Sequence, residues 1–191
     1  MKANSLPSHM DKAAFIAWSA ATEARCELVA GRVVEVPRDR RGNALIIMNL
    51  LFCALDKLDR SQWEVIKGFG VEAGPDTVRY PDIVVDREGG NGGDYTAMAP
   101  ALLIEVLSPE TATTDLGDKV AEYLQLPSLF AYVVVSEDEP KAWVRVRSEL
   151  FHEFAPAPII ITCTDAVIRI DALQFELPMT DIYARIDFDS D

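Results

Sequence analysis

The sequence contains few cysteines, few histidines and little positive charge. Its 191 residues include three cysteines and two histidines, and 18 Lys and Arg against 31 Asp and Glu give a formal net charge of −13. An odd number of cysteines without a CxxC or Cys/His spacing predicts neither a disulfide framework nor a zinc site, and favours a reducing cytoplasm. The negative charge argues against a partner that is held tightly by its phosphate backbone.

Long apolar runs are also missing. No segment reaches the roughly 18 apolar residues of a membrane span. The apolar stretch 13–18 directly follows Asp11 and Lys12, which favours a helix capped by Asp11 over a signal peptide. The length predicts one domain over 1–191, with 1–10 as a disordered leader and 176–191 as an acidic tail.

The apolar pattern predicts a mixed α/β domain. Segment 101–107 is apolar on both faces, which is typical of a central strand that is covered on both sides. A hairpin is expected at 26–36, with its turn at Ala30-Gly31. The remaining elements expected are helices at 11–23, 44–58 and 113–126, and strands at 63–71, 78–85, 131–135 and 142–147.

One carboxylate, Glu105, interrupts the apolar run of the predicted central strand. Burying a carboxylate is costly unless it is paired or binds a metal. Asp82 begins a comparable strand, and antiparallel pairing across the Gly-rich loop 87–94 would bring both carboxylates together. Facing carboxylates predict a hard divalent cation, Mg²⁺ or Mn²⁺. Taken singly, Glu105 also fits a structural carboxylate tied to an Arg or an amide, and Asp82 fits a strand-entry residue.

Lys119 lies on the predicted helix 113–126. A helical wheel centred on the apolar Leu116 places Lys119 at the border of the buried face, and Asp115 and Glu122 on the solvent side together with Asp118. The lysine can extend to water from that border. Beside a metal site it can instead orient or deprotonate the attacking water, with its pKa lowered by burial.

Three motifs carry a resemblance to a known family. They are Tyr80-Pro81-Asp82-Ile83-Val84-Val85-Asp86, then Glu105-Val106-Leu107-Ser108-Pro109-Glu110-Thr111, then Asp115-(x)3-Lys119-(x)3-Tyr123-Leu124. Together with segments 15–18, 27–34 and 71–79, this set resembles the Uma-two family of restriction endonucleases, within the PD-(D/E)XK nuclease superfamily. The resemblance covers roughly residues 10–150.

The resemblance implies a restriction-endonuclease-like fold, a mixed sheet flanked by helices, and metal-dependent hydrolysis of DNA phosphodiester bonds. By this analogy Asp82, Glu105 and Lys119 are catalytic. The metal, Mg²⁺ or Mn²⁺, would be held by Asp82, Glu105 and the carbonyl of Val106. Glu27 would be an auxiliary ligand, although it also fits an ordinary strand-edge glutamate.

The chain departs from the family pattern at two places. Leu107 occupies the lysine position of the E-x-K motif, so the lysine function passes to Lys119. Asn43 stands where the family often has a histidine. The second departure keeps open a nuclease fold that serves as an inactive binding or assembly module. A third alternative is hydrolysis of a small phosphoester.

The charge is unevenly distributed along the chain. Residues 1–80 carry 11 Lys and Arg against 10 Asp and Glu, whereas residues 81–191 carry 7 against 21. Arg38, Arg40 and Arg41 form a basic loop that we expect to bind substrate. The sequence therefore predicts weak, salt-sensitive DNA binding, and a homodimer, because cutting both strands of a duplex calls for two sites.

Overall fold

A six-stranded mixed sheet forms the centre of the molecule. The computed structural model describes residues 6–109 and 111–188. The strands lie in the order β10-β9-β8-β7-β6-β3, and β7 and β8 are parallel while every other neighbouring pair is antiparallel. Their bounds are β3 Trp63–Lys67, β6 Ile83–Arg87, β7 Leu102–Leu107, β8 Ala131–Ser136, β9 Ala142–Val146 and β10 Ile159–Ile161.

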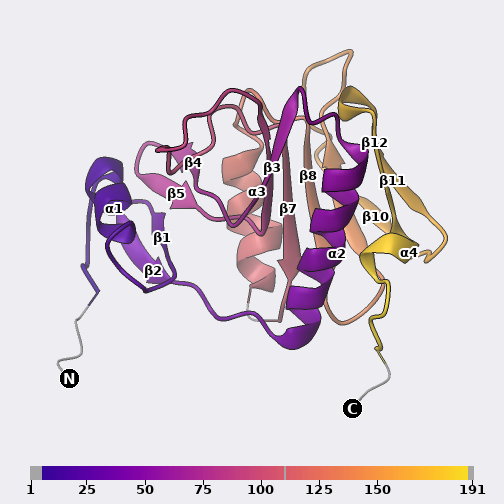
Figure 1. The fold of residues 1–191 in the computed structure, drawn as a ribbon, viewed down its shortest axis with the longest axis horizontal. Coiled ribbons are helices and arrows are strands. Elements are labelled where there is room, and N and C mark those ends of the chain that lie inside the picture. The colour runs from indigo at the N-terminus through magenta and orange to yellow at the C-terminus, as the bar shows by residue number, and fades with distance from the viewer. Residues whose placement is uncertain (1–5, 110, 189–191) are drawn as a thin grey trace.

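The central strand β7 is buried along its whole length, as its apolar sequence predicts. Ile104 and Val106 pack on the face covered by helix α2 (Arg41–Lys57). Leu103 and Leu107 pack on the opposite face, with Tyr123 of helix α3 (Lys119–Tyr123). Because side chains alternate along a strand, Glu105 projects toward the α3 face. Figure 1 shows the two helices on opposite sides of the sheet. The predicted mixed α/β architecture is therefore confirmed.

A second, four-stranded sheet lies at one end of the molecule (Figure 1). Its order is β2-β1-β5-β4, with β1 Cys26–Val29, β2 Arg32–Glu35, β4 Val71–Gly74 and β5 Thr77–Arg79. Helix α1 (Lys12–Ser19) is capped by Asp11, whose side chain accepts a hydrogen bond from the N–H of Ala14 at 2.8 Å. The hairpin turns at Ala30 and Gly31, which both have positive φ (47° and 78°), as tight hairpin turns require.

The predicted strands 63–71 and 78–85 each divide into two shorter strands. β3 and β6 belong to the central sheet, whereas β4 and β5 belong to the small sheet. β3 ends before Gly68, whose φ of 58° turns the chain out of the central sheet. The hydrophobic pattern alone does not reveal this change of sheet, because the strands of both sheets carry buried apolar residues.

The C-terminal segment predicted as an acidic tail packs against the core over 176–188. β12 (Phe175–Pro178) pairs with β11 (Val167–Ile170), and helix α4 (Met179–Ile182) follows. Met179 and Ile182 are buried in the cluster that includes α2, so apolar contacts hold a segment whose acidic residues face outward. Residues 189–191 lie outside the described part.

The N-terminal segment predicted as a leader contacts the small sheet through Met10, whose N–H donates to the carbonyl of Gly31 at 2.8 Å. Residues 1–5 lie outside the described part. The described residues include no helix with the length and apolar character that a membrane crossing requires.

Candidate active site

Asp82 and Glu105 lie side by side where β6 and β7 pair. The pairs Val84–Leu103 and Ile83–Ile104 set the antiparallel register, so the next position along brings Asp82 beside Glu105. The Val106 N–H donates to Oδ2 of Asp82 at 2.7 Å, which fixes the aspartate at the end of its strand. The antiparallel pairing predicted from the sequence thus places both carboxylates at one end of the sheet.

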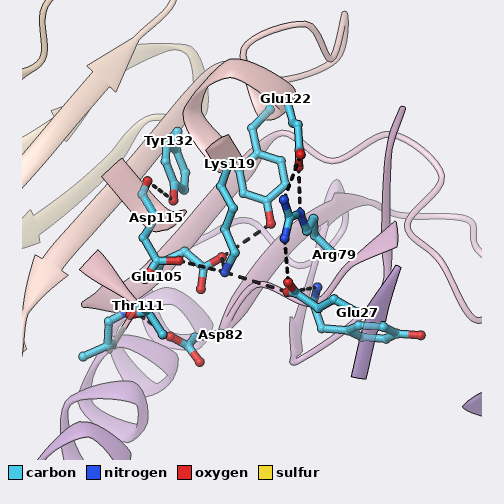
Figure 2. Close-up of polar contacts among 12 residues, drawn as sticks. Glu27, Arg79, Asp82, Glu105, Thr111, Asp115, Lys119, Glu122 and Tyr132 are labelled. Atoms are coloured by element: carbon cyan, nitrogen blue, oxygen red, sulfur yellow. Dashed lines mark hydrogen bonds and ion pairs between the residues drawn. The ribbon is translucent and has the colours of Figure 1, made fainter. Parts of the chain in front are cut away.

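Lys119 extends into a group of acidic side chains on the same face of the sheet (Figure 2). Its Nζ lies 2.7 Å from Oε1 of Glu105, 2.9 Å from Oδ1 of Asp115 and 3.8 Å from Oε1 of Glu27. The phenol of Tyr123 lies 3.4 Å from the same oxygen of Glu105. A single buried ammonium is therefore shared by carboxylates from a central strand, a helical turn and the small sheet.

A π-helical turn at Thr114–Asp118 directs Asp115 inward. The Lys119 N–H bonds to the carbonyl of Thr114, five residues earlier, instead of four residues earlier as in an α-helix. The expectation that Asp115 faces solvent is wrong: it is 2 % exposed, whereas Leu116 is 37 % exposed. The wheel failed because it took apolar residues to mark the buried face, and here that face carries the charged cluster.

Glu27 and Glu122 are joined by a buried arginine. Arg79 donates from Nη1 to Oε2 of Glu27 at 2.9 Å, and from Nε and Nη2 to the two oxygens of Glu122 at 2.7 and 2.8 Å. The remaining Glu27 oxygen accepts the Tyr80 N–H at 3.1 Å. Glu27 is therefore a buried, fully bonded carboxylate instead of an exposed strand-edge residue, and Glu122 is held by Arg79 instead of facing solvent freely.

The burial of this cluster changes its pKa values. Burial raises the pKa of Asp82 to about 6, although the Val106 N–H and Lys119 act in the opposite direction. Burial also raises the pKa of Glu105 well above its usual range, with Asp115 and Asp82 adding to the effect and Lys119 opposing it. Negative charge is thus costly at both carboxylates, and a bound cation would lower that cost.

The predicted lowering of the Lys119 pKa is wrong in direction. Burial alone would lower the pKa, but the charges of Glu105, Glu27 and Asp115 outweigh burial and raise it. Lys119 therefore remains an ammonium at neutral pH. As an ammonium it can donate hydrogen bonds and balance the negative charge of the neighbouring carboxylates.

A cavity of about 120 Å³ opens onto Asp82, Glu105 and Lys119. Arg38 and Arg40 of the predicted basic loop line it, and Arg40 lies 3.8 Å from Glu137. Arg41 begins α2, is exposed and is not among the residues that line the cavity. The loop thus brings two of its three predicted arginines to the site.

Oxygen atoms around the cavity fit a hard divalent cation. No group of three or more His, Cys, Asp or Glu in the described chain forms a complete metal site. Asp82 and Glu105 each supply a carboxylate, however. Among the described residues, the hydrogen bonds to Asp82 go to Oδ2 and those to Glu105 go to Oε1, so one oxygen of each carboxylate remains for a cation. The carbonyl of Val106 accepts the Asn43 amide at 3.1 Å, and Oδ1 of Asn43 is buried without a hydrogen-bond partner in the described structure. A cation with bound waters suits these donors.

Sequence reasoning missed Asp115, Arg79 and Arg25 as members of this region. Arg25 lines the cavity and pairs with Asp39 at 3.1 Å. No local pattern identifies Arg79, because its partners lie 52 and 43 residues away in the chain. The Asp115-(x)3-Lys119 spacing was a usable signal, since residues four apart share a helix face.

Comparison with known proteins bears on this arrangement. A crystal structure described as a "putative nuclease belonging to DUF820" from Anabaena variabilis ATCC 29413 is similar, with a TM-score of 0.70 and 17 % identity over 85 % of this chain and 92 % of that chain. At that identity the likeness shows the fold. No curated protein matches the chain. The model of the Uma2 family, described as "Putative restriction endonuclease", matches residues 13–157. The chain therefore belongs to the Uma2 family of restriction-endonuclease-like nucleases.

Proposed function

We propose that this protein is a Mg²⁺- or Mn²⁺-dependent endonuclease that hydrolyses DNA phosphodiester bonds. One observation carries the proposal: Asp82 and Glu105, from paired strands, meet in a cavity beside a buried ammonium that lies 2.7 Å from Glu105. Family membership supports the reaction class. Asp82 and Glu105 are the proposed metal-binding side chains, and the carbonyl of Val106 is the proposed main-chain ligand.

A divalent ion bound there would lower the pKa of a coordinated water and offset charge on the phosphate. The chain's own groups position the reactants. The Val106 N–H fixes Asp82, and Lys119 fixes Glu105 through their 2.7 Å contact. As an ammonium, Lys119 donates hydrogen bonds toward developing negative charge instead of removing a proton.

Glu27 is a weaker candidate for the auxiliary ligand proposed from the resemblance. Its two oxygens already accept hydrogen bonds from Arg79 and from the Tyr80 N–H. Asp115 is engaged by Lys119 at 2.9 Å. We therefore assign Glu27 and Asp115 to the positioning of Lys119, with Arg79 holding Glu27 in place.

The substrate would approach through the side of the cavity lined by Arg38 and Arg40. Few cations line this approach, and the chain carries a net charge of −13, so we expect DNA binding that is weak and sensitive to salt. A homodimer would supply the two sites that cleavage of both strands needs. The free cysteines Cys26, Cys53 and Cys163 agree with a reducing, cytoplasmic setting.

An inactive binding or assembly module is the second candidate, and Asn43 is the observation that favours it. Its side-chain amide donates a hydrogen bond at 3.1 Å to the carbonyl of Val106, which is the proposed main-chain metal ligand. A carbonyl oxygen has two lone pairs, so this hydrogen bond leaves room for a second partner. The nuclease therefore remains the better-supported proposal.

Plasmid cleavage tests the proposal. Purified protein is incubated with supercoiled plasmid, and separately with single-stranded circular DNA, in Mg²⁺ or Mn²⁺, alongside Asp82→Ala and Lys119→Ala. Asp56→Ala is the matched control, because Asp56 is an exposed aspartate on α2. We expect the wild type and the control to nick and linearise the plasmid, and both site variants to lose this activity.

A thermal-shift titration with the same metals separates the two candidates. Binding at 100-fold above the dissociation constant stabilises a protein by about 2.7 kcal/mol. A metal-induced shift that Asp82→Ala abolishes, together with cleavage, supports the nuclease. Intact DNA in every condition, with no metal-induced shift, refutes it and leaves the inactive module.

A further inference from the structure

A second, larger cavity of about 620 Å³ adjoins the candidate active site. It meets the first cavity at Asp82, and the linings of the two cavities also share Arg25, Val36, Asp39 and Tyr80. Its size falls within the range of about 300–1,000 Å³ that is typical of small-ligand sites. Any molecule held in it lies directly beside the proposed metal-binding aspartate.

Aromatic rings line this second cavity. Phe69, Tyr80 and Tyr95 contribute to its walls. The side chain of Tyr80 is held by two contacts: the centroid of its ring lies 6.5 Å from that of Phe15, and its hydroxyl lies 3.4 Å from Oγ of Ser19. Tyr95, in contrast, is 54 % exposed. An exposed ring at the wall of a cavity offers a stacking surface for a planar group.

The backbone around these rings is fastened to the active-site strand. The Gly68 N–H donates to the carbonyl of Asp82 at 3.0 Å, which holds the loop that carries Phe69. Gly70 forms a β-bridge with Thr96, and the Ala97 N–H donates to the Gly70 carbonyl at 2.7 Å. These contacts position the backbone next to Tyr95 while its ring stays exposed.

Gly70 permits this close approach of the two loops. A Cβ at position 70 would lie 2.5 Å from the backbone oxygen of Tyr95 and 3.0 Å from the side chain of Thr96. Both distances are shorter than ordinary carbon contacts. The glycine is thus a structural requirement for placing Tyr95 at the cavity.

The charges around the cavity suit a short strand better than a duplex. Lys67 and Arg25 are its cations, and Arg25 is already paired with Asp39 at 3.1 Å. Duplex binding depends on neutralising many phosphates, which a chain with a net charge of −13 does poorly. Stacking of unpaired bases on aromatic rings supplies affinity that needs few cations.

The geometry points to a nucleotide subsite in this cavity that takes an unpaired nucleotide of single-stranded DNA, next to the scissile phosphate. The base stacks on Tyr95 and Phe69, and the ammonium of Lys67 contacts the backbone phosphate. The position of the scissile phosphate rests on the proposed function, whereas the stacking does not. Single-stranded DNA is therefore the preferred substrate class over continuous duplex.

Fluorescence anisotropy tests the subsite without any cleavage. A fluorescein-labelled ten-nucleotide thymidine strand is titrated with protein in EDTA, and a labelled duplex of the same length is titrated in parallel. The variants are Tyr95→Ala, Tyr95→Phe and Lys67→Ala. Met98→Ala is the matched control, because Met98 is 58 % exposed near Tyr95 but does not line the cavity.

We expect Tyr95→Ala to weaken binding of the single strand by about tenfold, within the range for loss of one stacked base. Tyr95→Phe retains the ring, so it and Met98→Ala should stay within about twofold of the wild type, and Lys67→Ala should mainly reduce the salt dependence. Circular dichroism checks that each variant is folded. If Tyr95→Ala does not fold, Lys67→Ala serves as the second probe of the subsite.

Several results overturn the subsite: no measurable binding of the single strand by the wild type, binding that neither Tyr95→Ala nor Lys67→Ala changes, or a duplex that binds more tightly than the single strand. Binding that depends on Tyr95 without any cleavage in Mn²⁺ would refute the nuclease and leave the subsite intact. The two proposals thus fail separately.

Discussion

Replacing Lys119 by methionine removes the ammonium that lies between Glu105 and Asp115. The wild-type nitrogen lies 2.7 and 2.9 Å from these carboxylates, and all three side chains are buried. Methionine is similar in length to the lysine stem, so the substitution removes the charge and leaves most of the packing. The carboxylates then remain in the interior without their cation.

The expected loss of stability is large. Removing one partner of a buried ion pair costs about 3–5 kcal/mol, because the other charge stays buried and uncompensated. For domains of about 150–250 residues, each kcal/mol lowers the melting temperature by about 2–4 °C. Lys119→Met should therefore lower the melting temperature of the metal-free protein by about 6–20 °C at pH 8.

The pH dependence of this loss follows from the directions of the pKa shifts. Folding raises the pKa of Lys119. The stabilisation that this lysine contributes is therefore complete at every pH below the pKa of a lysine in the unfolded chain, and it is constant from pH 5 to 8. The pKa of Glu105 is raised by burial, so folded protein loses stability as pH rises above the unfolded value of about 4.3. Without the ammonium that penalty grows, and lowering the pH to 5 should relieve part of it.

Thermal unfolding followed by circular dichroism in EDTA, at pH 8 and pH 5, measures both effects. Lys141→Met is the control, because Lys141 pairs with Glu139 at the surface, where ion pairs contribute about 0–1 kcal/mol. The double variant Lys119→Met/Glu105→Gln should recover part of the loss. An unchanged melting temperature at pH 8, or equal losses at the two pH values, would refute this account of the cluster.

Three further predictions concern neighbouring groups. Arg79→Leu leaves the buried Glu27 and the partly exposed Glu122 without the guanidinium that joins them, so urea unfolding should show a loss of about 3 kcal/mol, whereas the same change at the exposed Arg169 should have little effect. Because the pKa of Asp82 is raised to about 6 and protons compete with metal, Mn²⁺ affinity by calorimetry should rise from pH 5 to pH 7; flat affinity would count against Asp82 as a ligand. Gly70→Ala should push away the loop 95–97, which hydrogen exchange would detect as faster exchange in that loop.

The central strand and its carboxylate could be predicted from the sequence because the patterns that indicate them lie within one short segment of the chain. An unbroken apolar run predicts a covered strand, and a single Glu105 within it marks a site. Asp82 follows from the antiparallel pairing of two strands, β6 and β7, that are consecutive in the central sheet and in the chain. These features need contacts only between segments that are close in the chain, so spacing and residue type suffice.

The rest of the cluster depends on tertiary placement. Arg79 binds Glu27 and Glu122, which come from the small sheet and from α3 respectively, and no periodicity connects the three positions. Asp115 was assigned to solvent because the wheel took the apolar Leu116 to mark the buried face, whereas Leu116 is 37 % exposed. The packing of 176–188 likewise depends on tertiary contacts, because Met179 and Ile182 are buried against α2 while the acidic residues of this segment stay at the surface.

The π-helical turn at Thr114–Asp118 makes the site depend on chain length at that point. A π-turn arises where a helix accommodates an additional residue, and each residue of an α-helix corresponds to a rotation of about 100°. Deleting one residue between Asp115 and Lys119 would shorten their spacing from four residues to three and rotate the two side chains relative to each other by about 100°, without changing either side chain. An alignment of relatives that shows a one-residue gap in this turn would therefore identify chains whose acidic cluster is assembled differently, even when every motif residue is present.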